Sequence, residues 1–357
     1  MRTQAPVRSL YSGVALLICL GWLLALPLPL VLAGPDGARK PELDFRLVGF
    51  ATVNALGQDG TTGGEGGQVV TVDTAEELLD YISRPGPYVI RVAGHIALPS
   101  DRAMYHVTSD KTIVGLGSSA VISGAGLNIG TSVSGPEDPR CVHNVIIRNI
   151  RFTDFPDDGI NVQYYAHHIW IDHNEFDRGF DGAVDIKRGS DYITVSWNYF
   201  HDHDKTMLLG HSDGNAAQDV GHLRVTYHHN WFDGTIQRHP RVRFGEPVHV
   251  FNNYYLNIHA QSYSYGVASQ MNAGVVVEGN YFENVPAPMR TDVGGAPGRI
   301  LARNNIFVNS GQPVFEDSVV EPSTYYDYTL DDPADVPEIV MRGAGINKIH
   351  PYGVAEQ

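Results

Sequence analysis

The sequence predicts an all-β protein whose chain coils into a single-stranded parallel β-helix. A short pattern recurs seven times from Val145 to Phe307: two alternating apolar residues, then an Asn, then an aromatic residue. The apolar pairs are Val145 and Ile147, Ile169 and Ile171, Ile193 and Val195, Val225 and Tyr227, Val248 and Val250, Val275 and Val277, and Ile300 and Ala302. Successive Asn positions from Asn174 to Asn305 are 24, 32, 23, 27 and 25 residues apart. Such a period is typical of repeats that cannot bury their apolar face alone.

Each position of the pattern has a structural interpretation. The alternating apolar pair predicts a β-strand with one buried face. An Asn directly after the strand tolerates the left-handed backbone that a sharp corner requires; the first copy has Ile150 there. If the turns stack, the Asn and aromatic side chains should form ladders along one axis. Two other repeat folds are disfavoured. A leucine-rich repeat would require a ladder of Leu residues, which is missing, and a propeller would require four strands per period.

Residues 1–33 have the layout of a secretory signal peptide. Arg2 and Arg8 precede an apolar run that continues to Ala33 and ends in small residues. A retained membrane anchor is the alternative, since the run is nearly long enough to span a bilayer. Pro27 and Pro29 near its end favour the signal peptide, and we therefore expect a secreted, extracellular protein.

Removal of this segment would leave an acidic chain with one thiol. It takes away two Arg and no acidic residue, so the formal net charge would change from −15 to −17. It also removes Cys19, so Cys141 would be the only cysteine and no disulfide framework could form. Export without disulfides is more typical of a bacterial secreted enzyme than of a small eukaryotic domain.

Residues 34–110 are predicted to form an N-terminal cap and the first turns of the coil. Thr74 and Glu77 fit a capping box at the start of an amphipathic helix that Pro85 ends. Residues 89–96 and 112–122 alternate like strands. A cap is expected because the first turn would otherwise expose core and strand edges.

The remaining chain completes one structural domain over residues 34–357. Residues 111–312 are predicted to form the core of the β-helix. Residues 313–357 form an irregular C-terminal tail, with one short helix expected from Ala334 to Met341. The tail should pack on the outside of the coil or close its second end.

Three acidic residues lie at comparable positions relative to the repeats. Asp158 is six residues after the aromatic residue of its copy, Asp181 is five after Phe176, and Asp185 is four further on. Stacked turns would bring these carboxylates to one lateral face, where their repulsion requires a cation or raised pKa values. Oxygen ligands without His or Cys favour Ca²⁺. Solvated acids in the turns are the alternative.

Basic residues are concentrated in the same region of the chain. They are Lys187, Arg188, Lys205, Arg238, Arg241 and Arg243. Ion pairing with the nearby acids is the alternative explanation for Lys187 and Arg188. The three arginines from 238 to 243 surround Pro240 and form a local anion site on an acidic chain. Together the acids and the arginines indicate a site for a polyanion, and the acidic total disfavours nucleic acid.

Four segments resemble successive motifs of the pectate lyases of polysaccharide lyase family 1. They are Trp170-Ile171-Asp172-His173, Asp181-Gly182-Ala183-Val184-Asp185-Ile186-Lys187, His201-Asp202-His203-Asp204-Lys205 and Arg238-x-Pro240-x-x-Arg243. The motifs occur in family order, and the resemblance covers roughly residues 45–345. It implies a right-handed, pectin lyase-like β-helix and a secreted enzyme that cleaves polygalacturonate by Ca²⁺-dependent β-elimination. We expect a monomer without a membrane partner.

The resemblance also implies roles for individual residues. Asp158, Asp181 and Asp185 match the Ca²⁺ ligands, and Asp157 is an additional candidate. Asp181 stands where some members have Glu, which keeps the ligand type. The other matches are Arg238 as catalytic base and Lys205 and Arg243 as residues that bind substrate uronates, with Lys187 and Arg241 as further substrate-binding candidates. The segment from Trp170 to His173 is interpreted as structural.

The elimination requires removal of the weakly acidic C5 proton of a uronate. A cation and basic side chains at the C6 carboxylate would stabilise the charge that develops there. A free guanidinium is treated as permanently protonated, but Ca²⁺, Lys205 and Arg243 around Arg238 would disfavour its charged form. An alkaline activity optimum is therefore expected.

Three alternatives remain open from the sequence. A polygalacturonase-like hydrolase would use paired acids such as Asp157 and Asp158, but its Gly-His-Gly and Arg-x-Lys motifs are missing. A pectin lyase would act on the methyl-esterified polymer, but that relative replaces the Ca²⁺ acids. A non-catalytic module that binds polysaccharide need not keep Arg238.

Overall fold

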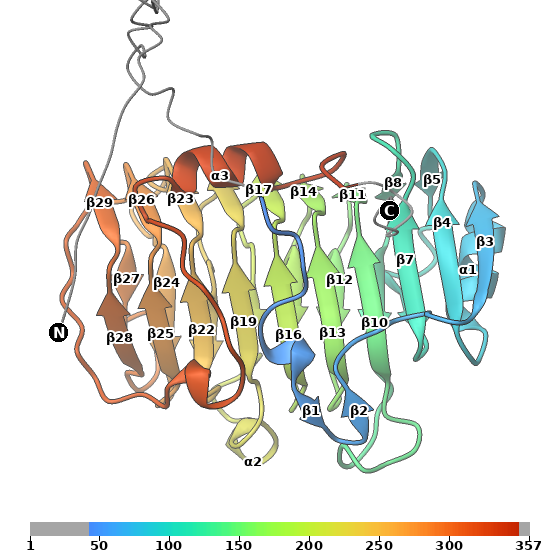
Figure 1. The fold of residues 1–357 in the computed structure, drawn as a ribbon, viewed down its shortest axis with the longest axis horizontal. Helices are drawn as coiled ribbons and strands as arrows, with labels where there is room; N and C mark the ends of the chain where they lie inside the picture. Colours follow the sequence, from blue (N-terminus) through green and yellow to red (C-terminus); the bar gives the residue numbers. More distant parts are fainter. Residues whose placement is uncertain (1–42, 350–357) are drawn as a thin grey trace, which may run out of the picture. The chain divides into compact units, whose positions relative to one another are not determined.

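The computed structural model describes residues 43–349, which form a single coil of parallel strands (Figure 1). The predicted signal peptide, residues 1–33, lies outside the described residues. From β4 onwards, consecutive strands alternate among three sheets, and strands one turn apart pair in parallel. The prediction of a parallel β-helix is confirmed. Within residues 43–349, no helix has the length and apolar character needed to cross a membrane.

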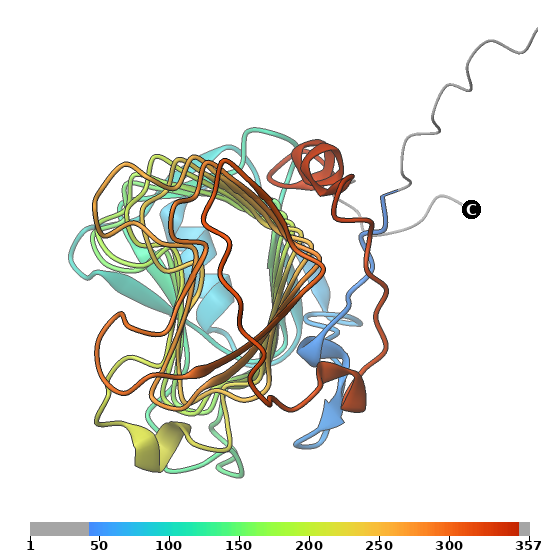
Figure 2. The same ribbon diagram turned by 90° about the vertical axis from the view of Figure 1, so that its left-hand side faces the viewer.

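The three sheets form the three sides of the coil, as the end-on view shows (Figure 2). The ten-stranded sheet comprises β3 (Gln68–Val72), β4 (Tyr88–Val92), β7 (Lys111–Gly115), β10 (His143–Arg148), β13 (His167–Asp172), β16 (Asp191–Ser196), β19 (Val225–His228), β22 (Val248–Phe251), β25 (Gly274–Glu278) and β28 (Arg299–Arg303). The nine-stranded sheet comprises β5 (His95–Ala97), β8 (Val121–Ser123), β11 (Arg151–Thr153), β14 (Glu175–Asp177), β17 (Tyr199–His201), β20 (Trp231–Asp233), β23 (Tyr254–Leu256), β26 (Tyr281–Glu283) and β29 (Ile306–Val308). The eight-stranded sheet comprises β6 (Met104–Val107), β9 (Gly126–Ile129), β12 (Ile160–Val162), β15 (Val184–Ile186), β18 (Leu208–Leu209), β21 (Arg241–Arg243), β24 (Val267–Gln270) and β27 (Met289–Arg290).

The repeated Asn residues form a buried hydrogen-bonded ladder between the ten-stranded and nine-stranded sheets. Asn198 donates from both its backbone N and its Nδ2 to Oδ1 of Asn230, at 3.1 and 3.0 Å. Nδ2 of Asn230 donates to the backbone oxygen of Val195 and to Oδ1 of Asn253. The same contacts recur from Asn174 to Asn305, and the backbone N of Ile150 donates to Asn174 at the other end. The predicted ladder is confirmed.

The left-handed residue at each corner is not the ladder Asn, which corrects the prediction. The residue before it has the positive φ: 52° at His173, 55° at Trp197 and 54° at His229. The ladder Asn instead directs its amide along the axis to satisfy backbone groups at the corner, where strand hydrogen bonds stop. Sequence position alone did not distinguish the two roles.

The aromatic residues of the repeats stack inside the coil. Phe176 and Phe200 have ring centroids 5.1 Å apart at an interplanar angle of 10°, and Phe232 continues the stack at 5.1 Å. The rings are fully buried with the apolar strand residues in one continuous core. The predicted aromatic ladder is therefore also confirmed.

The N-terminal part of the described chain caps the coil as predicted. Helix α1 (Ala75–Ser83) begins with a side-chain cap, in which the backbone N of Glu77 donates to Oγ1 of Thr74. Its buried residues Leu78 and Ile82 join the core next to the first turn. The segment before it contains η1 (Phe50–Thr52) and a hairpin of β1 (Asn54–Ala55) and β2 (Gln58–Asp59), and it runs across the ten-stranded sheet (Figure 1).

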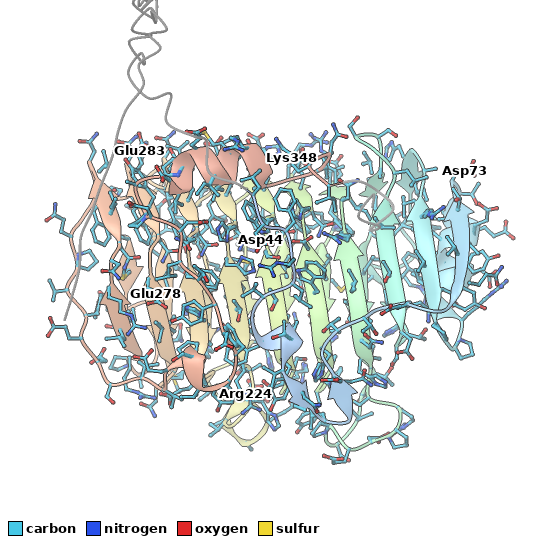
Figure 3. All side chains as sticks on the ribbon, viewed as in Figure 1. Asp44, Asp73, Arg224, Glu278, Glu283 and Lys348 are labelled. Atoms are coloured by element: carbon cyan, nitrogen blue, oxygen red, sulfur yellow. The ribbon has the colours of Figure 1, made fainter. Side chains whose placement is uncertain are left out.

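The C-terminal tail packs on the same sheet, whose outward side chains include Glu278 (Figure 3). Tyr328 donates to Oε1 of Glu278 at 2.6 Å, and Tyr326 contacts Thr226 through its hydroxyl at 2.8 Å. The tail includes η2 (Pro322–Thr324) and α3 (Val336–Gly343), which packs against β23. The predicted helix therefore exists, shifted by two residues. The terminal segments thus cover the ten-stranded sheet and, through α3, part of the nine-stranded sheet, so the eight-stranded sheet remains accessible for the site.

Candidate active site

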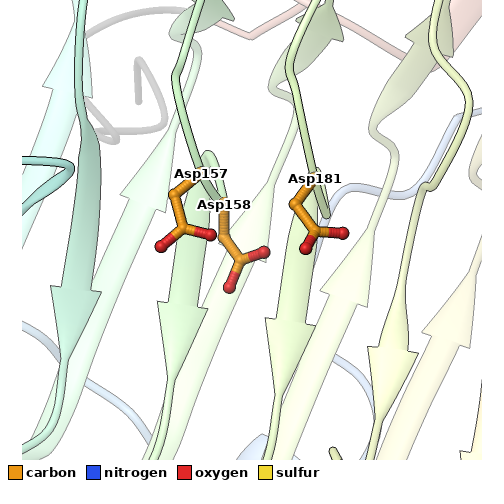
Figure 4. Close-up of side chains that lie close together, drawn as sticks. All are labelled: Asp157, Asp158 and Asp181. Carbon is orange, nitrogen blue, oxygen red and sulfur yellow. The ribbon is translucent and has the colours of Figure 1, made fainter.

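Acidic side chains from two neighbouring turns converge at the edge of the eight-stranded sheet. Asp157 and Asp158 end the loop before β12, and Asp181 lies in the equivalent loop before β15 (Figure 4). One carboxylate oxygen from each lies within 4.8 Å of the others. Asp158 is 3% exposed, whereas Asp157 is exposed and Asp181 is half-buried. This group, the acidic cluster, offers oxygen atoms from three carboxylates to a common point.

Asp185 lies beside the acidic cluster rather than in it. The sequence grouped it with Asp158 and Asp181, but the structure places Asp157 in that position, because the residues before β12 turn both adjacent carboxylates to the same side. Asp185 is in β15 and 3% exposed, and its Oδ1 accepts from the backbone N of Leu208 at 3.1 Å. The assignment of Asp185 as a metal ligand stays a prediction.

A lysine ammonium bridges the two buried carboxylates. Nζ of Lys187 lies 2.9 Å from Oδ2 of Asp158 and 3.7 Å from Oδ2 of Asp185. Burial raises the pKa of Asp185, the charge of Asp158 raises it further, and Lys187 only partly opposes both effects. Burial also raises the pKa of Asp158 despite its pairing with Lys187. The two buried acids thus have more negative charge than one lysine balances.

Gly182 lets two buried carboxylates of the site come close to its backbone. A Cβ atom at this position would lie 2.0 Å from Oδ1 of Asp185 and 3.0 Å from Oδ1 of Asp158. Any side chain at this position would displace both carboxylates, so the arrangement requires glycine. Carboxylate oxygens without His or Cys are the donor set that Ca²⁺ prefers. The residues present thus fit a Ca²⁺ ion, which Asp157, Asp158 and Asp181 could hold with Asp185 adjacent.

Two cations face the outer side of the acidic cluster. Nη1 of Arg238 and Nζ of Lys205 lie 3.3 and 3.2 Å from the same oxygen, Oδ1 of Asp181. The side chains of Arg238 and Lys205 are 17% and 26% exposed, so both retain access to solvent. The site therefore combines clustered acids with a guanidinium and an ammonium on one open face.

The backbone holds Arg238 in an uncommon conformation. Its φ is +66°, in the left-handed region that non-glycine residues seldom adopt. The backbone oxygen of Arg238 accepts from Met207 N at 2.7 Å, and its neighbour His239 is fixed by bonds to Thr235 and to the oxygen of Tyr265. Nε of Arg238 is buried without a partner among the described residues. These bonds fix the point from which the side chain of Arg238 extends towards Asp181.

Arg241 and Arg243, the other two predicted arginines, belong to a separate hydrogen-bonded network. Nε of Arg243 donates to Asp213 at 2.6 Å, and Nε of Arg241 donates to Gln270 at 2.6 Å. Gln270 in turn donates to Asp213 at 2.9 Å. Burial lowers the pKa of Arg241, and the charges of Arg243 and Arg238 lower it further. Arg241 also donates from Nη2 to the backbone oxygen of Val293, so two of its five N–H donors are used.

The sequence did not identify Asp213 and Gln270 as parts of the site. Neither residue stands in a charge pattern that marks it in the sequence. The register of β21 and β24 places Arg243 opposite Gln270, and Asp213 reaches both residues from the loop after β18. Lys187 is ion-paired, as the alternative explanation predicted, whereas the guanidinium of Arg188 lies 5.0 Å from the ring centroid of Tyr164.

Comparison with known proteins decides the family. The family model described as pectate lyase matches residues 38–312, well over half of the chain. The chain belongs to the pectate lyase family. It is therefore a polysaccharide lyase, and this assignment favours elimination over the hydrolase alternative.

Relatives in the pectate lyase family match nearly the full chain. A pectate trisaccharide-lyase of Thermotoga sp. (strain RQ2) is 43% identical over 354 residues, which cover 88% of this chain and 92% of that protein. A pectate trisaccharide-lyase of Bacillus licheniformis is 36% identical over 332 residues, with 88% and 91% covered. A crystal structure of a Bacillus sp. N165 pectate lyase in complex with trigalacturonate matches with a TM-score of 0.72 and 29% identity, covering 85% of this chain and 99% of that chain.

Proposed function

We propose that this chain is a secreted, Ca²⁺-dependent pectate lyase that cleaves α-1,4-linked polygalacturonate by β-elimination. The observation that carries the proposal is the contact of Arg238 and Lys205 with one oxygen of Asp181, a member of the acidic cluster. This arrangement joins a cation site to two basic side chains that suit a uronate carboxylate. Family membership supports the same chemistry.

In the proposed reaction, the neutral form of Arg238, which alkaline pH favours, accepts the C5 proton of the uronate at the cleavage point. The electrons of the C5–H bond form a C4–C5 double bond, the C4–O4 bond breaks, and the leaving oxygen takes a proton from solvent. A bound Ca²⁺ would polarise the C6 carboxylate and so make the C5 proton more acidic. The anchored backbone of Arg238 fixes its guanidinium at the edge of the site, as a base must be placed before proton transfer.

The remaining basic residues have proposed roles in binding. Lys205 is the candidate for the uronate next to the acidic cluster, because its ammonium is partly exposed and borders Asp181. Arg243 and Arg241 would bind the polymer through the donors that Asp213 and Gln270 leave available. Lys187 is buried against Asp158, so its proposed contribution is to balance charge as much as to touch substrate.

The proposed substrate is the unesterified polymer, and the proposed products include an unsaturated trisaccharide. Carboxylates and cations in one site suit free uronates better than methyl esters, which have no charge to pair. Relatives that are 43% and 36% identical are pectate trisaccharide-lyases, which supports this product length. Secretion rests on residues 1–33, and a monomer is proposed because both terminal segments already cover the outer face of the ten-stranded sheet.

The test is ultraviolet absorbance during incubation with polygalacturonate, with Ca²⁺ and then with excess EGTA. Elimination creates a conjugated double bond that absorbs, whereas hydrolysis yields only reducing ends. We expect absorbance that EGTA abolishes, greater activity on low-ester than on methylated polymer, and a maximum at alkaline pH. Reducing ends without absorbance would overturn the lyase proposal, and activity that survives EGTA would overturn Ca²⁺ dependence. Separation of the products by size would show whether a trisaccharide dominates.

A further inference from the structure

Phe180 is a large apolar side chain on the surface beside the acidic cluster. It is 74% exposed and directly precedes Asp181 in the loop between β14 and β15. Single exposed apolar residues are ordinary on proteins. Phe180, however, borders a site otherwise made of carboxylates, an ammonium and a guanidinium. An exposed aromatic ring at such a site indicates a role in binding.

The loop geometry keeps the Phe180 ring outside the core. The backbone of Gly179 lies against the buried ring of Phe155, so close that a Cβ at Gly179 would be 1.6 Å from a carbon of that ring. The backbone N of Phe180 donates to the oxygen of Phe155 at 3.0 Å, and that of Asp181 donates to the oxygen of Asp157 at 3.2 Å. Phe155 already fills the space below, and the backbone bonds hold Phe180 above it.

The ring lies near the residue proposed to bind a uronate. Nζ of Lys205 is 5.5 Å from the ring centroid of Phe180 and 3.2 Å from Oδ1 of Asp181. A galacturonate bound here would meet an ammonium on its carboxylate side and an aromatic face beside it. One face of the galactose-type ring carries mainly C–H groups, which pack favourably on the negative face of an aromatic ring.

We propose that Phe180 is a substrate-binding residue that packs on the C–H face of the galacturonate whose carboxylate is bound by Lys205. This inference rests on the proposed function and adds a specificity element to it. The ring would recognise the sugar of the substrate, and the cations its charge. A linear polyanion without apolar ring faces would gain nothing from Phe180.

The experiment compares wild type with Phe180→Ala, Phe180→Tyr and the control Val314→Ala, which alters an apolar side chain that is 80% exposed on the tail. Initial rates of absorbance at varied polygalacturonate concentration separate kcat from KM. We expect Phe180→Ala to raise KM about tenfold through lost apolar contact, with kcat changed less. Phe180→Tyr should restore most of the affinity, and Val314→Ala should match wild type.

A double-mutant cycle with Lys205→Ala separates sugar contact from positioning of the lysine. If the ring acts on the sugar, Phe180→Ala weakens binding further in the Lys205→Ala background. If it acts only by holding Lys205, it has no additional effect there, and the proposal is overturned. Equal KM values for wild type and Phe180→Ala would also overturn it, while leaving the lyase activity established.

Direct binding keeps the inference testable apart from catalysis. Calorimetric titration of trigalacturonate into Arg238→Ala and into Arg238→Ala/Phe180→Ala compares affinities without turnover. We expect weaker binding in the double variant, by about the same factor as KM. Equal affinities would contradict the proposed binding role of Phe180, independently of the reaction that the enzyme catalyses. Failure of wild type both to bind trigalacturonate and to cleave the polymer would overturn this inference together with the proposed function.

Discussion

Lys187 and Asp158 lie on neighbouring turns of the coil and form an ion pair of 2.9 Å whose carboxylate is almost fully buried. Asp185 is within reach of the same ammonium. Two buried acids therefore share one internal cation, and the negative charge left over is what a metal ion would balance. The arrangement links the stability of this region to the occupancy of the acidic cluster.

Replacing Lys187 by Met should destabilise the protein most in the absence of Ca²⁺. The change leaves Asp158 and Asp185 buried without their ammonium, which costs about 3 kcal/mol of unfolding free energy. Added Ca²⁺ should recover more stability in Lys187→Met than in wild type. Urea unfolding with EGTA and with Ca²⁺ measures both effects, and Lys205→Met, at a more exposed ammonium, serves as the control. Equal unfolding midpoints of Lys187→Met and wild type in EGTA would contradict the prediction.

Asp181→Asn should weaken Ca²⁺ binding without unfolding the chain. Asp181 is half-buried and supplies an oxygen to the acidic cluster, so its loss removes a ligand but leaves the core intact. At a Ca²⁺ concentration 100 times its Kd, wild type should gain about 2.7 kcal/mol of stability. The variant should gain much less in the same thermal denaturation series. Asp154→Asn, an exposed acid paired with Arg178 outside the cluster, should behave like wild type.

Arg238→Lys should reduce kcat by about 10²- to 10⁴-fold, the usual contribution of a positioned base. The substitution keeps a positive charge next to Asp181, so the apparent Kd for Ca²⁺ should change little. Absorbance assays give kcat, and the Ca²⁺-dependent shift in Tm reports on the intact site. A kcat of Arg238→Lys close to that of wild type would show that Arg238 is not the catalytic base.

Stability should fall as the pH decreases below about 6.5. Burial lowers the pKa of His239 to about 3 and that of His167 to about 3, below the unfolded value of 6.5. Each such histidine contributes stability that is fully present above pH 6.5 and is lost as the pH falls towards 3, because only the unfolded chain takes up the proton. Urea midpoints at pH 7.5, 5.5 and 4.5 should therefore decrease in that order.

A carboxylate in the tail interface should add to this acid sensitivity at lower pH. Burial alone would raise the pKa of Glu278, but hydrogen bonds from His249, Arg303 and Tyr328 outweigh it and lower the pKa to about 2. Its contribution is present above the unfolded value of 4.5 and is lost as the pH falls towards 2. His239→Asn should flatten the pH dependence between 6.5 and 4.5, while Glu278→Gln should flatten it below 4.5. Midpoints independent of pH would contradict both assignments.

Asn230→Ala should cost about 3 kcal/mol of unfolding free energy. Asn230 is fully buried, and its side chain satisfies backbone groups of Val195 and Asn198 that would be left without partners. Asn305 ends the ladder in a less buried position, so Asn305→Ala should cost less. Chemical denaturation of the two variants makes the comparison. Equal costs would show that ladder position is unimportant.

The fold could be predicted from the sequence because its repeat constrains every turn in the same way. Strand residues, ladder Asn residues and stacked aromatics each recur at a fixed phase, and the structure confirms all three. The prediction of the corner conformation was wrong by one residue, because the repeat pattern singles out the Asn and gives no signal for the varied residues before it, such as His173, Trp197 and Asn252.

The residues of the site were harder to predict from the sequence, because their convergence depends on strand register and on the direction of the loops. The acids near Asp158 and Asp181 were identified from their phase, yet the inclusion of Asp157 depends on how one short loop turns its side chains. Gln270 became part of the site only through the pairing of β21 with β24, and Asp213 only through the course of the loop after β18. Phe180 carried no sequence signal, since its exposure follows from the packing of Gly179 on Phe155.

The Asn ladder also bears on how such a chain can change in length. Successive ladder residues are 23 to 32 positions apart, yet the contact from Asn198 to Asn230 across the longest interval, at 3.1 Å, resembles that from Asn230 to Asn253 across the shortest, at 2.9 Å. The contacts along the axis of the coil are thus independent of loop length, because the extra residues of a longer turn lie in its loops. Loops at the eight-stranded sheet, such as the one containing α2 (Ala216–Asp219), could be lengthened or exchanged to change the surroundings of the site while the coil stays in register.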